Sequence, residues 1–188
     1  TFAPCKPEDR QQLAEMMESV EDIPADAILT GLPWDWESYG EYLDSYERMP
    51  KGINVGGMVG HCSVRVAAMG DRAIDQHHAS ADDIKKMCEL VEEALQGGAL
   101  GFSTSRTYLH VVPDGREVPG TWALPEELYA IGEVMGRLGK GIFECAVDND
   151  RQVHGMVGTP DRSVIEREVA WMKELSIRTG RSVSFGFV

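Results

Sequence analysis

Polar side chains with the chemistry for catalysis occur within or directly after the apolar segments of this sequence. Glu144 is flanked by apolar residues in the segment GIFECAV at 141–147. A carboxylate in such surroundings is costly unless a metal ion, a cation or a proton accompanies it. We therefore take Glu144 as the first candidate for a catalytic residue. The structural alternative is a buried ion pair with an arginine.

A second candidate, His61, stands at the end of the apolar segment 53–61 and is followed within four residues by Arg65. A neutral imidazole at a strand end can bind a metal ion, polarise a carbonyl group or hold a substrate carboxylate. The alternative is a histidine that is hydrogen-bonded into the interior. Arg65 can bind a substrate carboxylate through two parallel hydrogen bonds, or it forms a structural ion pair with an acidic residue.

A third polar cluster, Ser103 to Arg106, follows the apolar segment that begins at residue 99. The hydroxyl groups of Ser103 and Ser105 suit the binding of substrate oxygens, and Arg106 suits the recognition of a carboxylate. The sequence contains no GxSxG motif, so we do not expect a serine nucleophile. We predict that Ser103, Ser105 and Arg106 bind substrate together with Arg65.

The cysteines give little indication of a metal site. The four cysteines form no CxxC pair, which is typical of reduced thiols in a reducing compartment. The metal ligands are unknown, and Glu144 and Cys145 are weak candidates. Adjacent strand residues point to opposite faces, so these two cannot both face the interior of a regular barrel. His110 and His154 are expected in loops, and closure of these loops over a substrate is an alternative to a purely structural role, whereas His77 and His78 are expected in a surface loop.

The spacing of apolar residues predicts helices that alternate with short strands. Helices are expected over 7–20, 35–49, 81–96, 125–138 and 160–179, and strands over 53–61, 99–104, 141–147 and 182–188. Strands separated by helices pair in parallel, which indicates either a TIM barrel or a doubly wound sheet. No GxGxxG motif follows a strand. The long connection 105–123 favours a barrel, because barrel active sites are built from such loops.

Charge and composition exclude several classes of partner. The 188 residues carry a net charge of −13, with a pI near 4.7. This charge argues against a nucleic-acid backbone or an anionic membrane as the partner. No segment approaches the ~20 consecutive apolar residues of a membrane helix. We predict a cytoplasmic protein whose partner is a small molecule.

Four motifs in the same order resemble the D-aminoacylase (N-acyl-D-amino-acid deacylase) branch of the amidohydrolase superfamily. They are FAPCKPEDR, EDIPADAILTGLPWDWESYGEYLD, GHCSVRVAAMG and GALGFSTSRT. The resemblance implies a metal-dependent (β/α)8 barrel of the α/β class and the hydrolysis of an N-acyl amide. The chain would then be a single partial barrel domain over 1–188, covering about strands 3 to 6 and truncated at both ends.

The resemblance also implies that most of a zinc site lies outside this chain. The family's His-x-His motif and bridging cysteine would precede Thr1, and its catalytic aspartate would follow Val188. Ala146 falls where a metal-binding histidine is expected, and the segment 185–187 offers none. We therefore expect zinc in the parent protein and none in the fragment, which we expect to be inactive.

Two functional hypotheses remain open at this point. The first is an amidohydrolase that acts on a non-peptide C–N bond of an N-acyl amino acid. The second is a metal-free barrel of the same type that binds a small acidic ligand or serves as a scaffold. A partial barrel would expose strand edges and an apolar inner face, so a homo-oligomer is expected.

Overall fold

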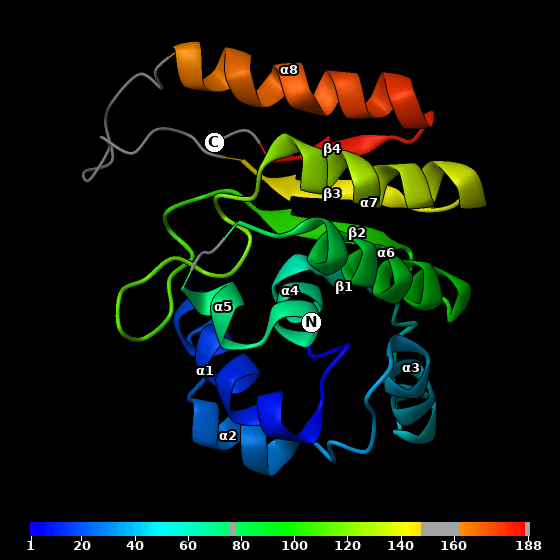
Figure 1. The fold of residues 1–188 in the computed structure, drawn as a ribbon. Helices are drawn as coiled ribbons and strands as arrows, with labels where there is room; N and C mark the ends of the chain where they lie inside the picture. The colour runs from blue at the N-terminus through cyan, green and yellow to red at the C-terminus, as the bar shows by residue number, and fades with distance from the viewer. Residues whose placement is uncertain (76–77, 148–161, 187–188) are drawn as a thin grey trace.

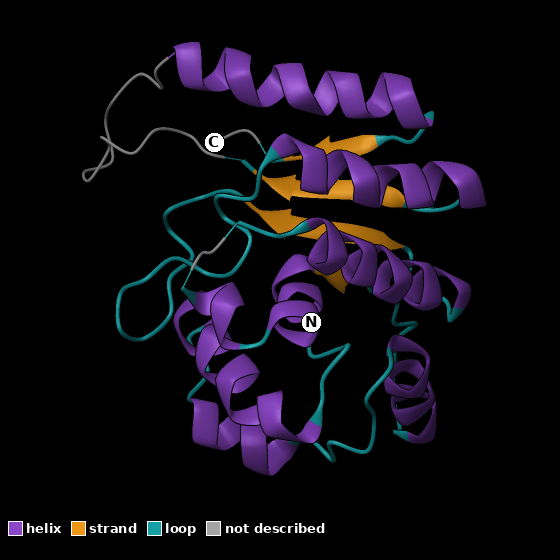
Figure 2. Ribbon diagram, in the orientation of Figure 1, coloured by secondary structure: helices purple, strands orange, loops and turns teal. Residues whose placement is uncertain are grey.

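Four parallel strands form the centre of the protein. The computed structural model describes residues 1–75, 78–147 and 162–186. The strands are β1 (Val59–Gly60), β2 (Gly101–Ser105), β3 (Ile142–Ala146) and β4 (Val183–Phe185). They pair in this order across the sheet, and every pair is parallel. Figures 1 and 2 show them side by side in the order of the sequence. The prediction of adjacent parallel strands in an α/β fold is confirmed.

Three long helices lie along one face of the sheet. They are α6 (Ala81–Gln96), α7 (Pro125–Leu138) and α8 (Arg162–Thr179). Helix α6 packs against α7, and α7 packs against α8 (Figure 1). Ser80 and Asp83 form a reciprocal capping box at the start of α6. Gly139 ends α7 in the left-handed conformation that glycine adopts without strain.

The amino-terminal third is helical and packs below β1 in Figure 1. It contains the short 3-10 helix η1 (Pro7–Asp9) and the helices α1 (Arg10–Glu21), α2 (Ala25–Gly31) and α3 (Tyr39–Arg48). The predicted helix over 35–49 begins only at Tyr39. Ser38 and Glu41 form a capping box there, which fixes the first turn.

The predicted strand over 53–61 is the main error in the expected elements. Only Val59–Gly60 is a strand, while the side chains of Ile53 and Val55 are 76% and 48% exposed. Glycines before β1 weaken strand formation. The chain then turns directly into helix α4 (His61–Met69), followed by α5 (Asp71–Ile74). His61 is therefore the first residue of a buried helix and not the last residue of a strand.

The two faces of the sheet differ in polarity. Phe102 and Phe143 are fully buried with their ring centroids 5.1 Å apart, and Phe143 contacts Trp171 of α8 at 6.0 Å. Side chains alternate along a strand. Ser103 and Glu144, which are partners in the register of β2 and β3, therefore lie on the opposite face. The expected apolar inner face is thus polar where these two strands pair.

None of the helices in the described residues combines the length and the apolar composition needed to cross a membrane. The described strands form a four-stranded sheet, and the assignment of this sheet to a partial barrel remains a prediction.

Candidate functional site

A cavity of about 210 Å³ lies at the carboxyl ends of the first three strands. Apolar side chains of α1 form one wall. Residues at the ends of the strands and in the loop after β2 form the other, including Gly60, Ser103, Ser105, His110, Glu144 and Ala146. Ligands of parallel α/β sheets bind outside the carboxyl ends of the strands. We therefore take this strand-end cavity as the candidate site.

Glu144 faces the strand-end cavity from β3. Its neighbour across the sheet is Ser103, and the Ser103 hydroxyl donates a hydrogen bond to Glu144 Oε2. The side chain of Glu144 is only partly buried. The expected buried ion pair with an arginine is therefore not the environment of Glu144 in the described residues. Instead, its carboxylate and the Ser103 hydroxyl together present polar oxygens to the cavity.

Ser105 and His110 form a second polar pair in the strand-end cavity. The Ser105 hydroxyl lies 2.7 Å from His110 Nδ1. Burial lowers the pKa of His110, although the charges of Glu21 and Glu144 oppose this shift. His110 is therefore neutral at pH 7. The structure thus places His110, which we expected in a loop over the substrate, at the rim of the site.

Cys145 does not belong to the cavity. Its side chain is fully buried on the helix-covered face of the sheet, opposite to Glu144. Burial raises the pKa of the Cys145 thiol to about 12, so this thiol is protonated at neutral pH. Glu144 and Cys145 cannot bind one metal ion together, in agreement with the alternation argument from the sequence.

His61 touches the cavity, but both of its ring nitrogens have protein partners. Nε2 lies 2.7 Å from Glu127 Oε1, and Nδ1 lies 2.8 Å from Thr104 Oγ1. The side chain of His61 is fully buried. In this geometry neither nitrogen is free to bind a metal ion or a substrate. The arrangement matches the alternative in which His61 is hydrogen-bonded into the interior.

Arg65 forms a buried ion pair and does not face the cavity. Its Nη1 atom lies 2.7 Å from each carboxylate oxygen of Glu127, and both side chains are 2% exposed. Burial alone would raise the pKa of Glu127, but His61 and Arg65 outweigh it and hold the pKa below its usual value. The structural alternative for Arg65 is therefore the one that the structure supports.

Arg106 is also held by a carboxylate. Its Nε and Nη2 atoms donate to the two oxygens of Glu168 at 2.7 and 3.2 Å. Its Nη1 atom donates to the carbonyl oxygens of Thr121 and Ala123. The guanidinium group also lies 5.5 Å from the ring centroid of Trp171. The donors of Arg106 thus fix α8 and the loop after β2, and they are not directed at the cavity.

The sequence reasoning missed Glu127 and Glu168. Each glutamate begins a pattern in which the buried residues recur three to four positions apart along a helix. For Glu127 these are Ile131, Val134 and Met135, and for Glu168 they are Trp171, Met172 and Leu175. A carboxylate on the apolar stripe of a helix requires a cation in the interior. That signal was present in the sequence, and the structure identifies the cations as Arg65 and Arg106.

The remaining polar residues of the loops are less informative. Arg116 is exposed and forms ion pairs with Asp75 at 2.9 Å and with Asp114 at 2.8 Å. His78 is exposed, as expected for a surface loop. His77 and His154 lie outside the described residues.

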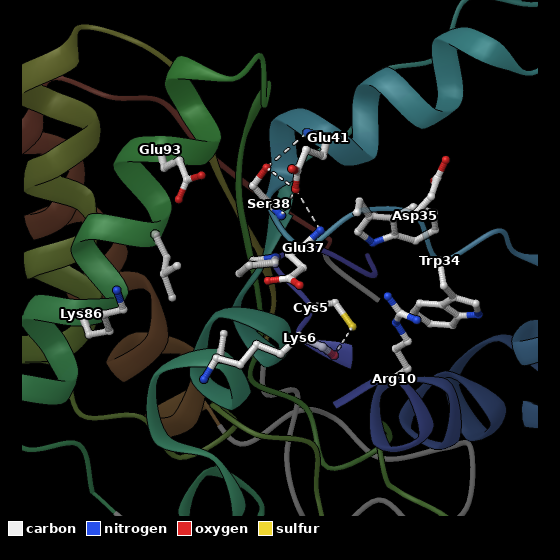
Figure 3. A pocket seen from close by; sticks show the side chains of 14 residues that line it. Cys5, Lys6, Arg10, Trp34, Asp35, Glu37, Ser38, Glu41, Lys86 and Glu93 are labelled. Carbon is white, nitrogen blue, oxygen red and sulfur yellow. Dashed lines mark hydrogen bonds between the residues drawn. The ribbon is translucent and has the colours of Figure 1, made fainter. Parts of the chain in front are cut away.

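A larger cavity, of about 740 Å³, lies away from the strand ends, between α1, α3 and α6 (Figure 3). Two of its acidic side chains already have partners. Asp35 pairs with Arg48, and Glu41 belongs to the capping box of α3. Trp34 and Trp36 are buried, so their rings offer little surface to a ligand. We do not take this cavity as the functional site.

The strand-end cavity is acidic in the part of the chain that the structure describes. Its lining includes Glu21 and Glu144 but no lysine or arginine. Among the described residues, no group of three or more His, Cys, Asp or Glu side chains is placed to hold a metal ion. The residues present therefore do not fit a complete zinc site, which normally has three protein ligands.

Comparison with known proteins links this chain to a superfamily. No family model matches the chain. A D-aminoacylase of Alcaligenes xylosoxydans xylosoxydans is 34% identical over 96 residues, which are 51% of this chain and 19% of that enzyme. The chain is a relative of the D-aminoacylases of the amidohydrolase superfamily. The predicted resemblance is confirmed.

Two further proteins match a larger share of this chain. An uncharacterised protein of Mycobacterium tuberculosis is 30% identical over 156 residues, which are 78% of this chain and 25% of that protein. The N-acyl-D-glutamate deacylase of Bordetella bronchiseptica, solved with zinc and a phosphonate inhibitor, has a TM-score of 0.60. It is 21% identical, and the match covers 90% of this chain and 28% of that one. The chain spans about a quarter or less of the length of the curated relatives it matches.

Proposed function

We propose that this chain forms part of an amidohydrolase that hydrolyses the amide bond of an N-acyl amino acid, a non-peptide C–N bond. The observation that carries the proposal is the position of Glu144. Its carboxylate lies at the carboxyl end of a parallel strand, beside the Ser103 hydroxyl and within a cavity. The sequence similarity to deacylases of N-acyl-D-amino acids supports the same chemistry.

The proposed fold of the whole is a (β/α)8 barrel, of which this chain supplies about strands 3 to 6. Each described strand is parallel to its neighbour, and a helix follows each of the first three strands. The polar ends of β2 and β3 would then open toward the barrel interior. Active sites of such barrels lie at the carboxyl ends of the strands.

Within this site we assign Glu144 as the catalytic candidate and the hydroxyl groups of Ser103 and Ser105 as substrate-binding groups. A carboxylate at this position can accept a proton from an attacking water molecule. The predicted catalytic role of His61 gains no support, because both ring nitrogens are occupied. The predicted substrate-binding roles of Arg65 and Arg106 gain none either, because buried carboxylates hold both side chains.

Zinc is part of the proposal because the N-acyl-D-glutamate deacylase of similar fold was solved with zinc. A metal ion in such an enzyme polarises the amide carbonyl and lowers the pKa of a bound water molecule. Glu144 shares the cavity with Glu21 and His110, but among the described residues no three His, Cys, Asp or Glu side chains are placed to hold a metal ion, so they do not fit a zinc site by themselves.

The proposal is tested by assaying a form of the protein that spans the length of the relatives. N-acyl-D-glutamate, N-acyl-D-aspartate and their L-isomers are the first substrates to compare. We expect Glu144→Gln to abolish hydrolysis while circular dichroism and the melting temperature stay unchanged. Glu89→Gln, at an exposed position of α6, is the matched control and should leave hydrolysis unchanged. Full activity of Glu144→Gln would contradict the assignment.

One observation favours the second candidate function, a metal-free barrel that binds a small ligand or acts as a scaffold. Ala146 occupies the end of β3, where the resemblance places a histidine. Absence of hydrolysis together with saturable binding of a small acidic ligand, such as an N-acyl amino acid, would favour this candidate.

A further inference from the structure

A chain of four buried polar side chains runs behind the strand-end cavity. It joins Arg65 and His61 of α4, Glu127 of α7 and Thr104 of β2, with three contacts at 2.7 Å and one at 2.8 Å. These residues are at most 2% exposed. The chain thus connects two helices to the end of the strand that lines the cavity.

The proton positions in this chain follow from its chemistry. Glu127 is bound to Arg65 through both carboxylate oxygens and is therefore ionised, so it can only accept hydrogen bonds. His61 Nε2 must then donate its proton to Glu127. In a neutral imidazole the other nitrogen, Nδ1, carries no proton and accepts. The Thr104 hydroxyl is left as the donor to Nδ1, and its orientation is fixed.

Thr104 stands between the two serines that face the cavity. Adjacent strand residues point to opposite faces, so a fixed Thr104 on the helix side holds Ser103 and Ser105 on the cavity side. Ser103 contacts Glu144, and Ser105 contacts His110. The orientation of both cavity-facing pairs therefore depends on how the end of β2 is held.

The loop after β2 rests on the same imidazole ring. Gly120 has a φ of +98°, and a Cβ atom at this position would lie 2.6 Å from His61 Nδ1. Only glycine permits this approach without displacing the ring. The loop 106–124, which carries His110 to the rim of the cavity, is therefore positioned by His61 as well.

We propose that Glu127, through His61 and Thr104, is a positioning residue that sets the geometry of the Ser103, Ser105 and His110 side chains at the cavity. The inference rests on the proposed function only in taking this cavity as the substrate site. The hydrogen bonds of the network can be measured whether or not the protein hydrolyses a substrate.

The test uses nitrogen-15 NMR of the histidine side chains in the 188-residue protein. We expect His61 to be the neutral tautomer with the proton on Nε2 between pH 6 and pH 8. A proton on Nδ1 would make Thr104 the acceptor and would overturn the proposal. This measurement needs no substituted protein and no substrate, so its result is independent of whether hydrolysis is observed.

Two substitutions of Thr104 complete the test. Thr104→Val removes the hydroxyl group at nearly constant volume, and Thr104→Ser keeps it. We expect Thr104→Val to keep the proton on Nε2, because Glu127 still accepts it, but to speed amide hydrogen exchange at Ser105 by about tenfold or more. Thr104→Ser should restore the wild-type exchange rate. A Thr104→Val protein with the wild-type exchange rate would overturn the proposal, and so would a Thr104→Ser protein that fails to restore it.

Discussion

The hydroxyl of Ser105 lies 2.7 Å from Nδ1 of His110, five residues farther along the chain. This contact ties the loop after β2 back onto the end of the strand from which it leaves. Arg106 holds the same loop at the carbonyl oxygens of Thr121 and Ala123. The long connection is therefore anchored at both of its ends, and it forms part of the wall of the strand-end cavity.

The buried pair of Arg65 and Glu127 is expected to be essential for stability. Arg65→Met should lower the free energy of unfolding by about 3–5 kcal/mol, because it leaves the Glu127 carboxylate buried without its cation. Urea denaturation followed by circular dichroism measures the change. Arg48→Met, in the exposed pair with Asp35, is the control and should cause no measurable change. An equally stable Arg65→Met protein would show that Glu127 finds another partner or is protonated.

Stability should fall as the pH is lowered from 7 to 5. Burial lowers the pKa of His61 below its usual value of 6.5, while Glu127 partly opposes the shift. The unfolded chain therefore takes up a proton near pH 6.5 that the folded protein does not, which favours unfolding at lower pH. His110 adds to this effect, since burial lowers its pKa too. Urea midpoints measured at pH 5, 6 and 7 should show the decline.

The contribution of His61 to this decline can be isolated by substitution. His61→Asn should reduce the dependence of the urea midpoint on pH, whereas the exposed His78→Asn should leave it unchanged. Below about pH 4.5 a further loss is expected, because Glu127 and Glu168 have lowered pKa values in the folded protein. If the urea midpoint depends on pH in the same way in the wild type and in His61→Asn, the lowered pKa of His61 does not contribute to the decline in stability.

Gly101 should not tolerate a side chain. A Cβ atom there would lie 2.0 Å from the carbonyl oxygen of Ile142 in the neighbouring strand. Gly101→Ala should therefore separate the start of β2 from β3 and cost about 3 kcal/mol or more. Gly31→Ala, where nothing lies within 4 Å, is the matched control and should fold normally. Thermal melts should show a clearly lower melting temperature for Gly101→Ala and an unchanged one for Gly31→Ala.

The 188-residue protein should hold no stoichiometric zinc. Of the two predicted ligands, Glu144 faces the cavity and Cys145 is buried on the other face of the sheet, and catalytic zinc needs three protein ligands. After dialysis, elemental analysis should find less than about 0.1 zinc per chain. One tightly held zinc per chain would mean that Glu144 is joined by ligands outside the described residues.

Self-association of the 188-residue protein remains a prediction. The outer strands of the described sheet are β1 and β4, and Ile142 and Phe185 are 42% and 39% exposed. Exposed strand edges and apolar side chains favour pairing with a second copy. Light scattering should show a dimer or a larger species, and Ile142→Thr should weaken it more than Ile53→Thr. A monomer at all concentrations would contradict the expectation.

The helices α1, α3, α6, α7 and α8 and the parallel order of the strands could be predicted from the sequence because their signals are local, whereas α2, α4 and α5 were not expected. Ser80, with Asp83 three residues later, marks the start of α6, and Pro125 and Gly139 mark the two ends of α7. The segment 53–61 was misread because apolar composition alone does not distinguish a short strand from an exposed segment. Ile53 and Val55 are exposed because no part of the described sheet covers them.

The sequence alone determined the alternation of Glu144 and Cys145, the polar character of the strand ends and the resemblance to amidohydrolases. These properties depend on residue order over short distances. Only the tertiary structure decided the partners of His61, Arg65 and Arg106. Glu127 lies 62 residues from Arg65, and Glu168 lies 62 residues from Arg106. A buried charge selects whichever opposite charge the packing of distant helices brings within hydrogen-bond distance, and that packing is set by the whole sheet.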